Sequence, residues 1–377
     1  MIYEDVSSPT RRTLTATARI LSTLRLDGAL LVGLGLIALY GQIVLYSASG
    51  QDIDVVMRGT VRLGIGAIAM LALAQVKPSV LRNLAPWLYA LGVVLLIVVD
   101  LIGYIGKGAQ RWLDLGFVRF QPSEIMKLAV PMMCAWFMHE RTVPPDAKSL
   151  IALAALVLVP VGLTVAQPDL GTGLLILIAG ALVVLLAGLS IRLILGLAVL
   201  ALAGAWTGWN FLHDYQQKRV LMFLDPAADP LGAGYHIIQS TIAIGSGGAF
   251  GKGWLSGSQG QLEFLPERST DFIFAVIGEE FGLVGAVILL LLFLFVVMRA
   301  LYLAMQTQDT FARLLSGSLA LTFFVYVFIN AGMVSGLLPV VGVPLPLVSY
   351  GGTSMVTILA SFGILMSLYS HRKLVGS

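Results

Sequence analysis

Long runs of apolar residues, separated by short polar segments, fill the chain from about residue 28 to residue 370. A helix needs roughly 20 such residues to cross a bilayer, because the hydrocarbon core is about 30 Å thick and a helix rises about 1.5 Å per residue. The segments that meet this requirement are approximately 28–48, 59–76, 83–104, 122–140, 149–166, 172–190, 192–212, 271–299, 313–338 and 346–370. The pattern predicts an all-α, polytopic integral membrane protein with about ten transmembrane helices. Only "GLSIR" separates the sixth and seventh segments, so nine spans is the alternative, and it would invert every later loop.

The polar stretches divide the chain into an N-terminal segment 1–27, one transmembrane domain 28–370 and a tail 371–377. The loop 213–270 between the seventh and eighth helices is unusually long, and loops of such length are commonly functional or disordered. Within it, "YHIIQSTIAIGSGGAF" has the apolar content of a short interfacial or re-entrant helix. Its end "SGGAFGKG" fails the phosphate-loop pattern, because Ser246 and Gly253 stand where Gly and Ser or Thr are required.

The distribution of Lys and Arg predicts the orientation in the membrane. With ten spans and a cytoplasmic N-terminus, most Lys and Arg residues between spans fall on the inside, as in membrane proteins generally. Both termini are therefore expected in the cytoplasm and the loop 213–270 outside. The first apolar run is too long for the core of a cleaved signal peptide, so it is interpreted as a retained span.

Composition narrows the function classes. The 377 residues are 58% hydrophobic, with a mean hydropathy of +0.92, outside the range of soluble domains. The net charge of +3 comes from scattered basic residues and forms no patch, so no nucleic-acid partner is expected. The single cysteine, Cys134, excludes an internal disulfide, and the four histidines lie too far apart in sequence to suggest a metal cluster.

In this topology, several polar residues lie at the outer ends of predicted helices: Asp100, Glu124, Lys127, Asp169 and Asp271. Charged groups at membrane depth are costly and normally face a bundle interior or a cavity. A shared cavity that opens outward is therefore the economical hypothesis.

Three of these residues, Glu124, Lys127 and Asp271, also have a purely structural interpretation. Glu124 and Lys127, three positions apart, share a helix face and could simply neutralise each other during insertion. Asp271 could be a first-turn acid that suits the helix dipole behind a Ser269 or Thr270 cap. Its place after a basic outer loop favours a functional role, whereas Glu279 and Glu280 are expected to be structural, hydrogen-bonded to neighbouring helices.

Two outer loops together hold seven basic residues against the general trend. They are Lys107, Arg111, Arg119, Lys218, Arg219, Lys252 and Arg268. They could attract an anionic substrate such as a lipid-linked diphosphate, or contact anionic lipid headgroups. Their number favours the substrate.

Nearly the whole chain resembles the SEDS family (shape, elongation, division and sporulation) of membrane glycosyltransferases. The resemblance rests on "LYSAS", "GAQRWLDLGFVRFQPSEIMKLAV", "QPDLGTG", "FLPERSTDFIFAVIGEEFGLVG" and "LPLVSYGGTS", together with most of the loop 213–270. "VVGVPLPLVSYGGTSM" and "PSEIMKLAVPMM" are more similar to the elongation type, RodA, than to the division type. One departure is Ser269, where relatives commonly have histidine.

The resemblance implies polymerisation of lipid II into undecaprenyl-diphosphate-linked glycan for cell elongation, in the bacterial inner membrane with the active site facing the periplasm. By position, Asp271 corresponds to the family's proposed catalytic aspartate, a general base for inverting transfer, and Glu124 with Lys127 to its cavity pair. The further candidate substrate-binding residues are Arg111, Asp169, Lys218, Arg219, Arg268, Ser349 and Tyr350. The implied partners are a class B penicillin-binding protein with transpeptidase activity and other rod-complex membrane proteins. No cofactor is fixed by the sequence, and a divalent cation, Mg²⁺ or Mn²⁺, is the candidate.

Two rival functions fit the same composition. A flippase for lipid-linked precursors would also use a charged cavity, but its polar residues would continue to the cytoplasmic half. A non-catalytic scaffold for the penicillin-binding protein would tolerate replacement of Asp271. The motif resemblance, rather than composition, favours the glycosyltransferase.

Overall fold

The structure is a computed structural model, and it describes residues 24–106, 109–114, 119–209, 217, 221, 225, 234–261, 265 and 267–371. Most of the predicted segment 1–27 and of the tail 371–377 lies outside these residues. Each of the ten predicted spans is a helix. They are α2 (Gly28–Ala48), α3 (Ile53–Gln75), α4 (Pro78–Ile102), α5 (Pro122–Met138), α6 (Ala147–Ala166), α7 (Leu170–Leu186), α8 (Ile191–Gly208), α12 (Ile273–Met305), α13 (Thr310–Val334) and α14 (Thr353–Ser370).

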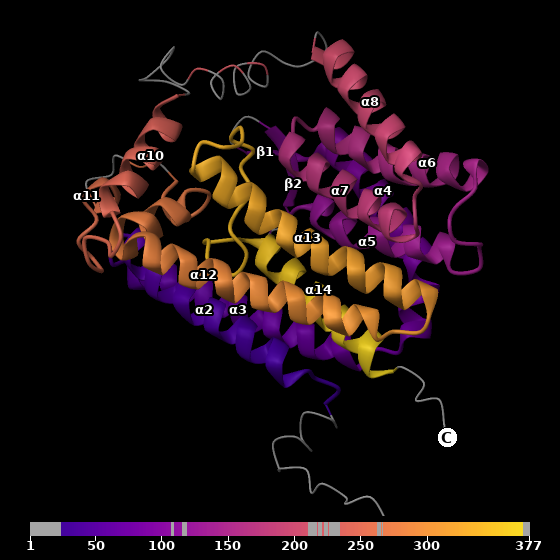
Figure 1. Ribbon diagram of the computed structural model, residues 1–377, viewed down its shortest axis with the longest axis horizontal. Helices are drawn as coiled ribbons and strands as arrows, with labels where there is room; N and C mark the ends of the chain where they lie inside the picture. Colours follow the sequence, from indigo (N-terminus) through magenta and orange to yellow (C-terminus); the bar gives the residue numbers. More distant parts are fainter. Residues whose placement is uncertain are drawn as a thin grey trace, which may run out of the picture.

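Seven of these helices are long and apolar enough to cross a membrane, namely α2, α3, α4, α6, α12, α13 and α14. The apolar helix α7 has 17 residues, as does α5, and α8 has 18. Figure 1 shows the long helices packed alongside one another, with α12 and α13 crossing the front of the bundle. The predicted all-α, polytopic membrane fold is therefore confirmed.

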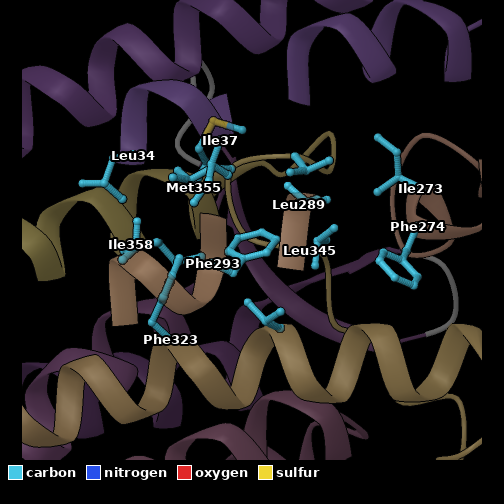
Figure 2. Packing of buried hydrophobic residues seen from close by; sticks show 14 of the residues in the cluster. Leu34, Ile37, Ile273, Phe274, Leu289, Phe293, Phe323, Leu345, Met355 and Ile358 are labelled. Carbon is cyan, nitrogen blue, oxygen red and sulfur yellow. The ribbon is translucent and has the colours of Figure 1, made fainter. Parts of the chain in front are cut away.

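The centre of the bundle is a buried apolar cluster formed mainly by α2, α12, α13 and α14. Phe323 of α13 lies edge-on to Phe362 of α14, with ring centroids 4.9 Å apart, and packs against Phe293 of α12 at 5.8 Å. Figure 2 shows how side chains from α2, α12, α13 and α14 meet around Phe293. α3 packs closely against α14, where a Cβ placed on Gly363 would lie 2.4 Å from the carbonyl oxygen of Met70. This core holds the ends of α12 and α14 in place.

A small sheet and two further helices lie outside the ten helices that the apolar pattern predicts. A small antiparallel sheet, β1 (Tyr104–Gly106), β2 (Ala109–Asp114) and β3 (Arg119–Phe120), connects α4 to α5 and was not predicted. The helix expected in the long loop is α10 (Tyr235–Gly247), which buries one face against α12, and a short helix, α11 (Ser258–Gln261), follows it. In Figure 1, α10 and α11 gather at one end of the bundle.

The predicted eighth span is broken by the loop that follows α10. Gly282 has φ 64° and ψ −162°, so the hydrogen-bond ladder of α12 is interrupted there. The N–H groups of Lys252 and Gly253 donate to the carbonyls of Glu279 and Glu280, each at 3.0 Å. In return, the N–H groups of residues 283 and 284 donate to the carbonyls of residues 248 and 249, also at 3.0 Å. The loop thereby replaces the bonds that the break removes.

Candidate active site

A cavity of about 840 Å³ opens at one end of the bundle. Its wall combines residues of β2, the first turns of α5 and α7, α10, α13, and the turns that precede α12 and α14. The charged and hydrogen-bonding side chains in the wall are Arg111, Trp112, Gln121, Glu124, Lys127, Asp169, Thr172, His236, Glu267, Thr270, Asp271, Tyr326, Tyr350, Thr353 and Ser354. The expected cavity is therefore present, and it lies at the end where the outer ends of the spans were predicted.

Asp271 lies in a turn just before α12. Its backbone carbonyl accepts a hydrogen bond from Asn330 Nδ2 at 2.9 Å, and the same amide group donates to the carbonyl of Val343 at 2.7 Å. The carbonyl of Thr270 accepts from Ser349 Oγ at 2.6 Å. These bonds fix the turn against α13 and the segment before α14.

Two further contacts shape the surroundings of the Asp271 side chain. The N–H of Tyr350 donates to the carbonyl of Ser269 at 2.8 Å. Gly342 has φ +79°, and a Cβ placed on it would lie 3.4 Å from Asp271 Oδ2. Glycine is required there for the backbone conformation, and it lets the chain pass close to the carboxylate.

The structural interpretation of Asp271 as a first-turn acid is wrong. α12 begins at Ile273, its N-cap is Phe272 without a side-chain cap, and its first turn has no acidic residue. Glu279 and Glu280 are buried and hydrogen-bonded, as predicted. Glu280 accepts from Ser47 of α2, and Glu279 accepts from the N–H of Gln259 in α11 at 2.9 Å. Glu279 also pairs with Lys252 of the loop after α10, at 2.7 Å.

Glu124 and Lys127 form a buried ion pair in the cavity wall. Lys127 Nζ lies 2.7 Å from Glu124 Oε1, and each residue is 5% exposed. The ammonium also lies 5.3 Å from the centre of the Tyr326 ring, a cation–π distance. Among the described residues, Glu124 Oε2 has no hydrogen-bond partner, so it can accept a hydrogen bond from a molecule in the cavity.

Asp169 and Arg111 form an adjoining part of the wall. Asp169 caps α7 by accepting from the N–H of Thr172 at 3.2 Å, and its other oxygen accepts from Gln121 Nε2 at 2.9 Å. Arg111 Nη1 lies 3.8 Å from Asp169 Oδ1, and the same guanidinium donates to the carbonyls of Gln167 and Pro168. Arg111 is thus held over the turn between α6 and α7, with part of its surface toward the cavity.

The structure brings six of the predicted site residues into one wall: Asp271, Glu124, Lys127, Arg111, Asp169 and Tyr350. Ser349 is buried and bonds to backbone instead of lining the cavity. Arg268 is also absent from the lining, and its Nη2 lies 3.2 Å from a Cβ placed on Gly50. Lys218 and Arg219 lie outside the described residues.

The shared-cavity expectation is wrong for Asp100, and the outer basic residue Lys252, like Arg268, is also absent from the lining. Lys252 is engaged by Glu279 and Ser258 rather than by the cavity. Asp100 is exposed near the end of α4 and does not line the cavity. Lys107 and the side chain of Arg119 are not among the described parts of the chain.

Sequence reasoning assigned no site role to several residues that the fold adds to the wall, notably Gln121, Tyr326, His236 and Glu267. Gln121 directly precedes the helix that holds Glu124, so its position beside a predicted site residue could have indicated that it lines the cavity. Tyr326 lies within an apolar span, where the hydropathy pattern cannot separate a cavity-facing tyrosine from a core residue.

Comparison with known proteins places the chain in a family. A family model described as "Cell cycle protein", which covers FtsW, RodA and SpoVE, matches residues 23–374. The chain belongs to the FtsW/RodA/SpoVE family. This confirms the resemblance that the motifs indicate.

Curated members of the FtsW/RodA/SpoVE family match over most of the chain. The peptidoglycan glycosyltransferase MrdB of Escherichia coli (strain K12) is 54% identical over 351 residues, covering 93% of this chain and 95% of the relative. MrdB of Helicobacter pylori (strain ATCC 700392 / 26695) is 39% identical, covering 78% of each chain. Stage V sporulation protein E of Bacillus subtilis (strain 168) is 32% identical over 353 residues, covering 88% of this chain and 94% of the relative.

Solved structures of family members share the fold. One belongs to a study described as "Structural coordination of polymerization and crosslinking by a peptidoglycan synthase complex"; its TM-score is 0.81 at 36% identity, covering 92% of this chain and 98% of that one. The crystal structure of the rod shape determining protein RodA of Thermus thermophilus has a TM-score of 0.70 at 31% identity, covering 92% and 97%.

The cavity wall lacks an all-protein metal site among the described residues. Within the described part of the chain, no three His, Cys, Asp or Glu side chains are grouped to hold an ion. The carboxylates in the wall nevertheless offer the oxygen ligands that Mg²⁺ and Mn²⁺ prefer. Such ions usually take one or two protein carboxylates together with substrate phosphates, and the wall fits that mode rather than an all-protein cage.

Proposed function

We propose that this chain is a peptidoglycan glycosyltransferase that polymerises lipid II, with Asp271 as the general base. The observation that carries the proposal is the placement of Asp271 in the same 840 Å³ cavity as Lys127, Glu124 and Arg111. The curated relatives named above as peptidoglycan glycosyltransferases support it.

The reaction assigns different roles to the charged side chains of the cavity wall. The C4 hydroxyl of an acceptor sugar attacks the anomeric carbon of a diphosphate-linked donor, and the configuration inverts. Asp271 accepts the proton of that hydroxyl, as a positioned carboxylate can. Diphosphate leaves without needing a proton, unlike a sugar alkoxide. Lys127 and Arg111 supply positive charge for the departing diphosphate.

A bound Mg²⁺ or Mn²⁺ would add positive charge at the diphosphate, held by wall carboxylates such as Asp271 and Glu267. We keep this cation as a proposal. Its test is the loss of lipid II polymerisation on chelation with EDTA and the recovery of activity on adding back either metal.

The setting of the reaction is also proposed. We place the cavity on the periplasmic side of the bacterial inner membrane, in agreement with the distribution of Lys and Arg. A class B penicillin-binding protein is the proposed partner, supported by the likeness to a chain of a peptidoglycan synthase complex. Other rod-complex membrane proteins are proposed to join them.

The shape of the interior argues against a flippase. A second cavity that Lys127 also lines measures about 20 Å³ and lies between Lys127, Thr322 and Ser361. That volume holds about one water molecule and no sugar. It therefore offers lipid II no passage from the large cavity past Lys127.

The deciding experiment replaces Asp271 with asparagine and measures lipid II polymerisation by the purified chain with its penicillin-binding protein. Removal of a general base lowers the rate by about 100-fold or more, so the Asp271→Asn variant is expected to yield little glycan. The matched control is Asp146→Asn, an N-cap of α6 that does not line the cavity, because asparagine caps a helix as well as aspartate does. Wild-type polymerisation by the Asp271→Asn variant would refute the assigned role, and translocation of lipid II without polymerisation by the wild-type chain would favour a flippase.

A further inference from the structure

Two arginines lie inside the transmembrane helix α3, beyond the residues predicted for the site. Arg58 and Arg62 are four positions apart, so they share one face of the helix. They lie about 8 Å and about 14 Å along the axis from the first residue of α3. Across the residues that the structure describes, no ion pair joins either guanidinium to a carboxylate. Asp52 and Asp54 attract the Arg58 guanidinium from beyond ion-pair distance. Because no contact with a carboxylate among the described residues neutralises either arginine, both can bind an anion from outside the chain.

Both guanidinium groups contact Tyr350, which lines the Asp271 cavity. Arg58 Nε donates to the Tyr350 hydroxyl at 3.3 Å, and Arg62 lies 4.4 Å from the centre of the same ring. Arg62 Nη1 also donates to the carbonyl of Gly351 at 3.5 Å. Since Tyr350 and Gly351 belong to the cavity wall, the two arginines lie directly behind that wall.

The surface around the arginines is amphipathic. Val61, Ile65 and Ile68 follow Arg58 at three, seven and ten positions, which puts them on the same face of α3. Each of these apolar side chains is more than half exposed. A cationic end with an apolar strip below it matches a diphosphate carried on a polyprenyl chain, because guanidinium groups bind phosphate oxygens in a bidentate manner.

Tyr350 also links this surface to the catalytic turn. Its N–H donates to the carbonyl of Ser269, two residues before Asp271. A ligand held by Arg58 and Arg62 is therefore separated from the Asp271 cavity by one side chain and its adjoining glycines, Gly351 and Gly352.

We propose that Arg58 and Arg62 form a lipid-facing binding site for the diphosphate of a polyprenyl-linked substrate, with Tyr350 as the wall between this site and the cavity. The inference rests on the proposed function, because it states that the substrate of the glycosyltransferase reaction enters from the bilayer beside α3. Arg58 and Arg62 bind the substrate before reaction and take no proton from it.

The test compares initial rates of lipid II polymerisation in nanodiscs of neutral phosphatidylcholine. The double variant Arg58→Gln with Arg62→Gln is expected to raise KM about tenfold or more while kcat changes by less than about threefold. Lysine at both positions keeps the charge and is expected to recover part of the loss. The control is Arg82→Gln, an arginine of α4 that lines a separate pocket beside α13. A KM for the double glutamine variant within twofold of the wild-type value would overturn the proposal.

A second set of nanodiscs identifies the source of the phosphate. In discs that contain anionic phosphatidylglycerol, the same rise in KM supports a substrate site. A defect that appears only in those discs would mean that the arginines bind phospholipid headgroups, and the proposal would be wrong.

Photocrosslinking tests the site without any variant. A photoreactive polyprenyl diphosphate, added to the wild-type chain, is expected to label α3 between residues 57 and 68 and to be competed by unlabelled undecaprenyl diphosphate. Labelling confined to other helices would overturn the proposal. Competed labelling of α3 in a chain that polymerises no lipid II would support the arginine site and count against the proposed glycosyltransferase.

Discussion

At the residue scale, the position of the proposed base depends on side chains that never touch the substrate. Asn330 is fully buried, and its amide group holds the carbonyls of Asp271 and Val343 at 2.9 and 2.7 Å. Leaving a buried carbonyl without its donor costs about 1–3 kcal/mol. Asn330 therefore stabilises the fold and positions the catalytic turn at once.

Replacing Asn330 with leucine is expected to lower the unfolding temperature and to lower kcat beyond what the loss of folded protein explains. The control is Ser318→Ala on the same helix, which removes a 2.7 Å bond to the carbonyl of Ala179 far from Asp271. It is expected to lower stability only. The readouts are thermal unfolding in detergent and polymerisation per folded molecule, and equal kcat losses in the two variants would contradict a positioning role.

The ion pair of Glu124 and Lys127 makes a distinct prediction. Removing one partner leaves a buried charge uncompensated, which costs about 3–5 kcal/mol in proteins. Glu124→Gln and Lys127→Met are each expected to destabilise the chain, and the double variant is expected to be more stable than either. Polymerisation stays low in the double variant, because Lys127 no longer supplies charge to the diphosphate. A double variant with wild-type activity would assign the pair to insertion and folding alone.

The sequence identifies some residues of the site and misplaces others. Asp271, Glu124 and Lys127 could be named because a charge at the end of an apolar run is conspicuous. Ser349 shares a motif with Tyr350, yet only Tyr350 faces the cavity, because adjacent residues point in different directions. Motif membership cannot resolve that difference.

At the element scale, the apolar pattern located all ten long helices but missed their interruptions. The last span was expected from residue 346, and α14 begins at Thr353. Residues 346–352 were predicted as the start of this span, but together with residues 340–345 they form a non-helical wall, and Ser349 and Tyr350 in it bond to the turn before α12. Such bonds join positions about 80 residues apart, which no local pattern records.

The break in α12 gives a prediction about Gly282. A Cβ at this position would lie 2.3 Å from the N atom of Gly251, and the φ of 64° is unfavourable for other residues. Gly282→Ala is therefore expected to separate the loop from the helix, lowering both the unfolding temperature and the activity. Gly245→Ala, in α10 with open space around it, is the control and is expected to behave as wild type. If the unfolding temperature and activity of Gly282→Ala equal those of this control, the backbone hydrogen bonds between the loop and α12 are dispensable.

At the scale of the whole molecule, orientation in the membrane is the testable property. Gln51 lies between α2 and α3, the end at which the cavity opens, and Glu140 lies between α5 and α6 at the opposite end. In a Cys134→Ala background, Gln51→Cys is expected to react with a membrane-impermeant maleimide in spheroplasts, and Glu140→Cys only after lysis. The reverse pattern would place the cavity in the cytoplasm and contradict the proposed reaction with lipid II.

Three successive carbonyls, those of residues 269, 270 and 271, accept their bonds from Tyr350, Ser349 and Asn330. A peptide stretch tethered in this way moves with the end of α13 and the non-helical segment that follows it, whereas Lys127 and Glu124 belong to α5. A small tilt of α13 relative to α5 would change the gap between proton acceptor and cation while every one of these tethers stayed intact. The distance between these two groups therefore depends on how α13 packs against α5, and not on the catalytic turn alone.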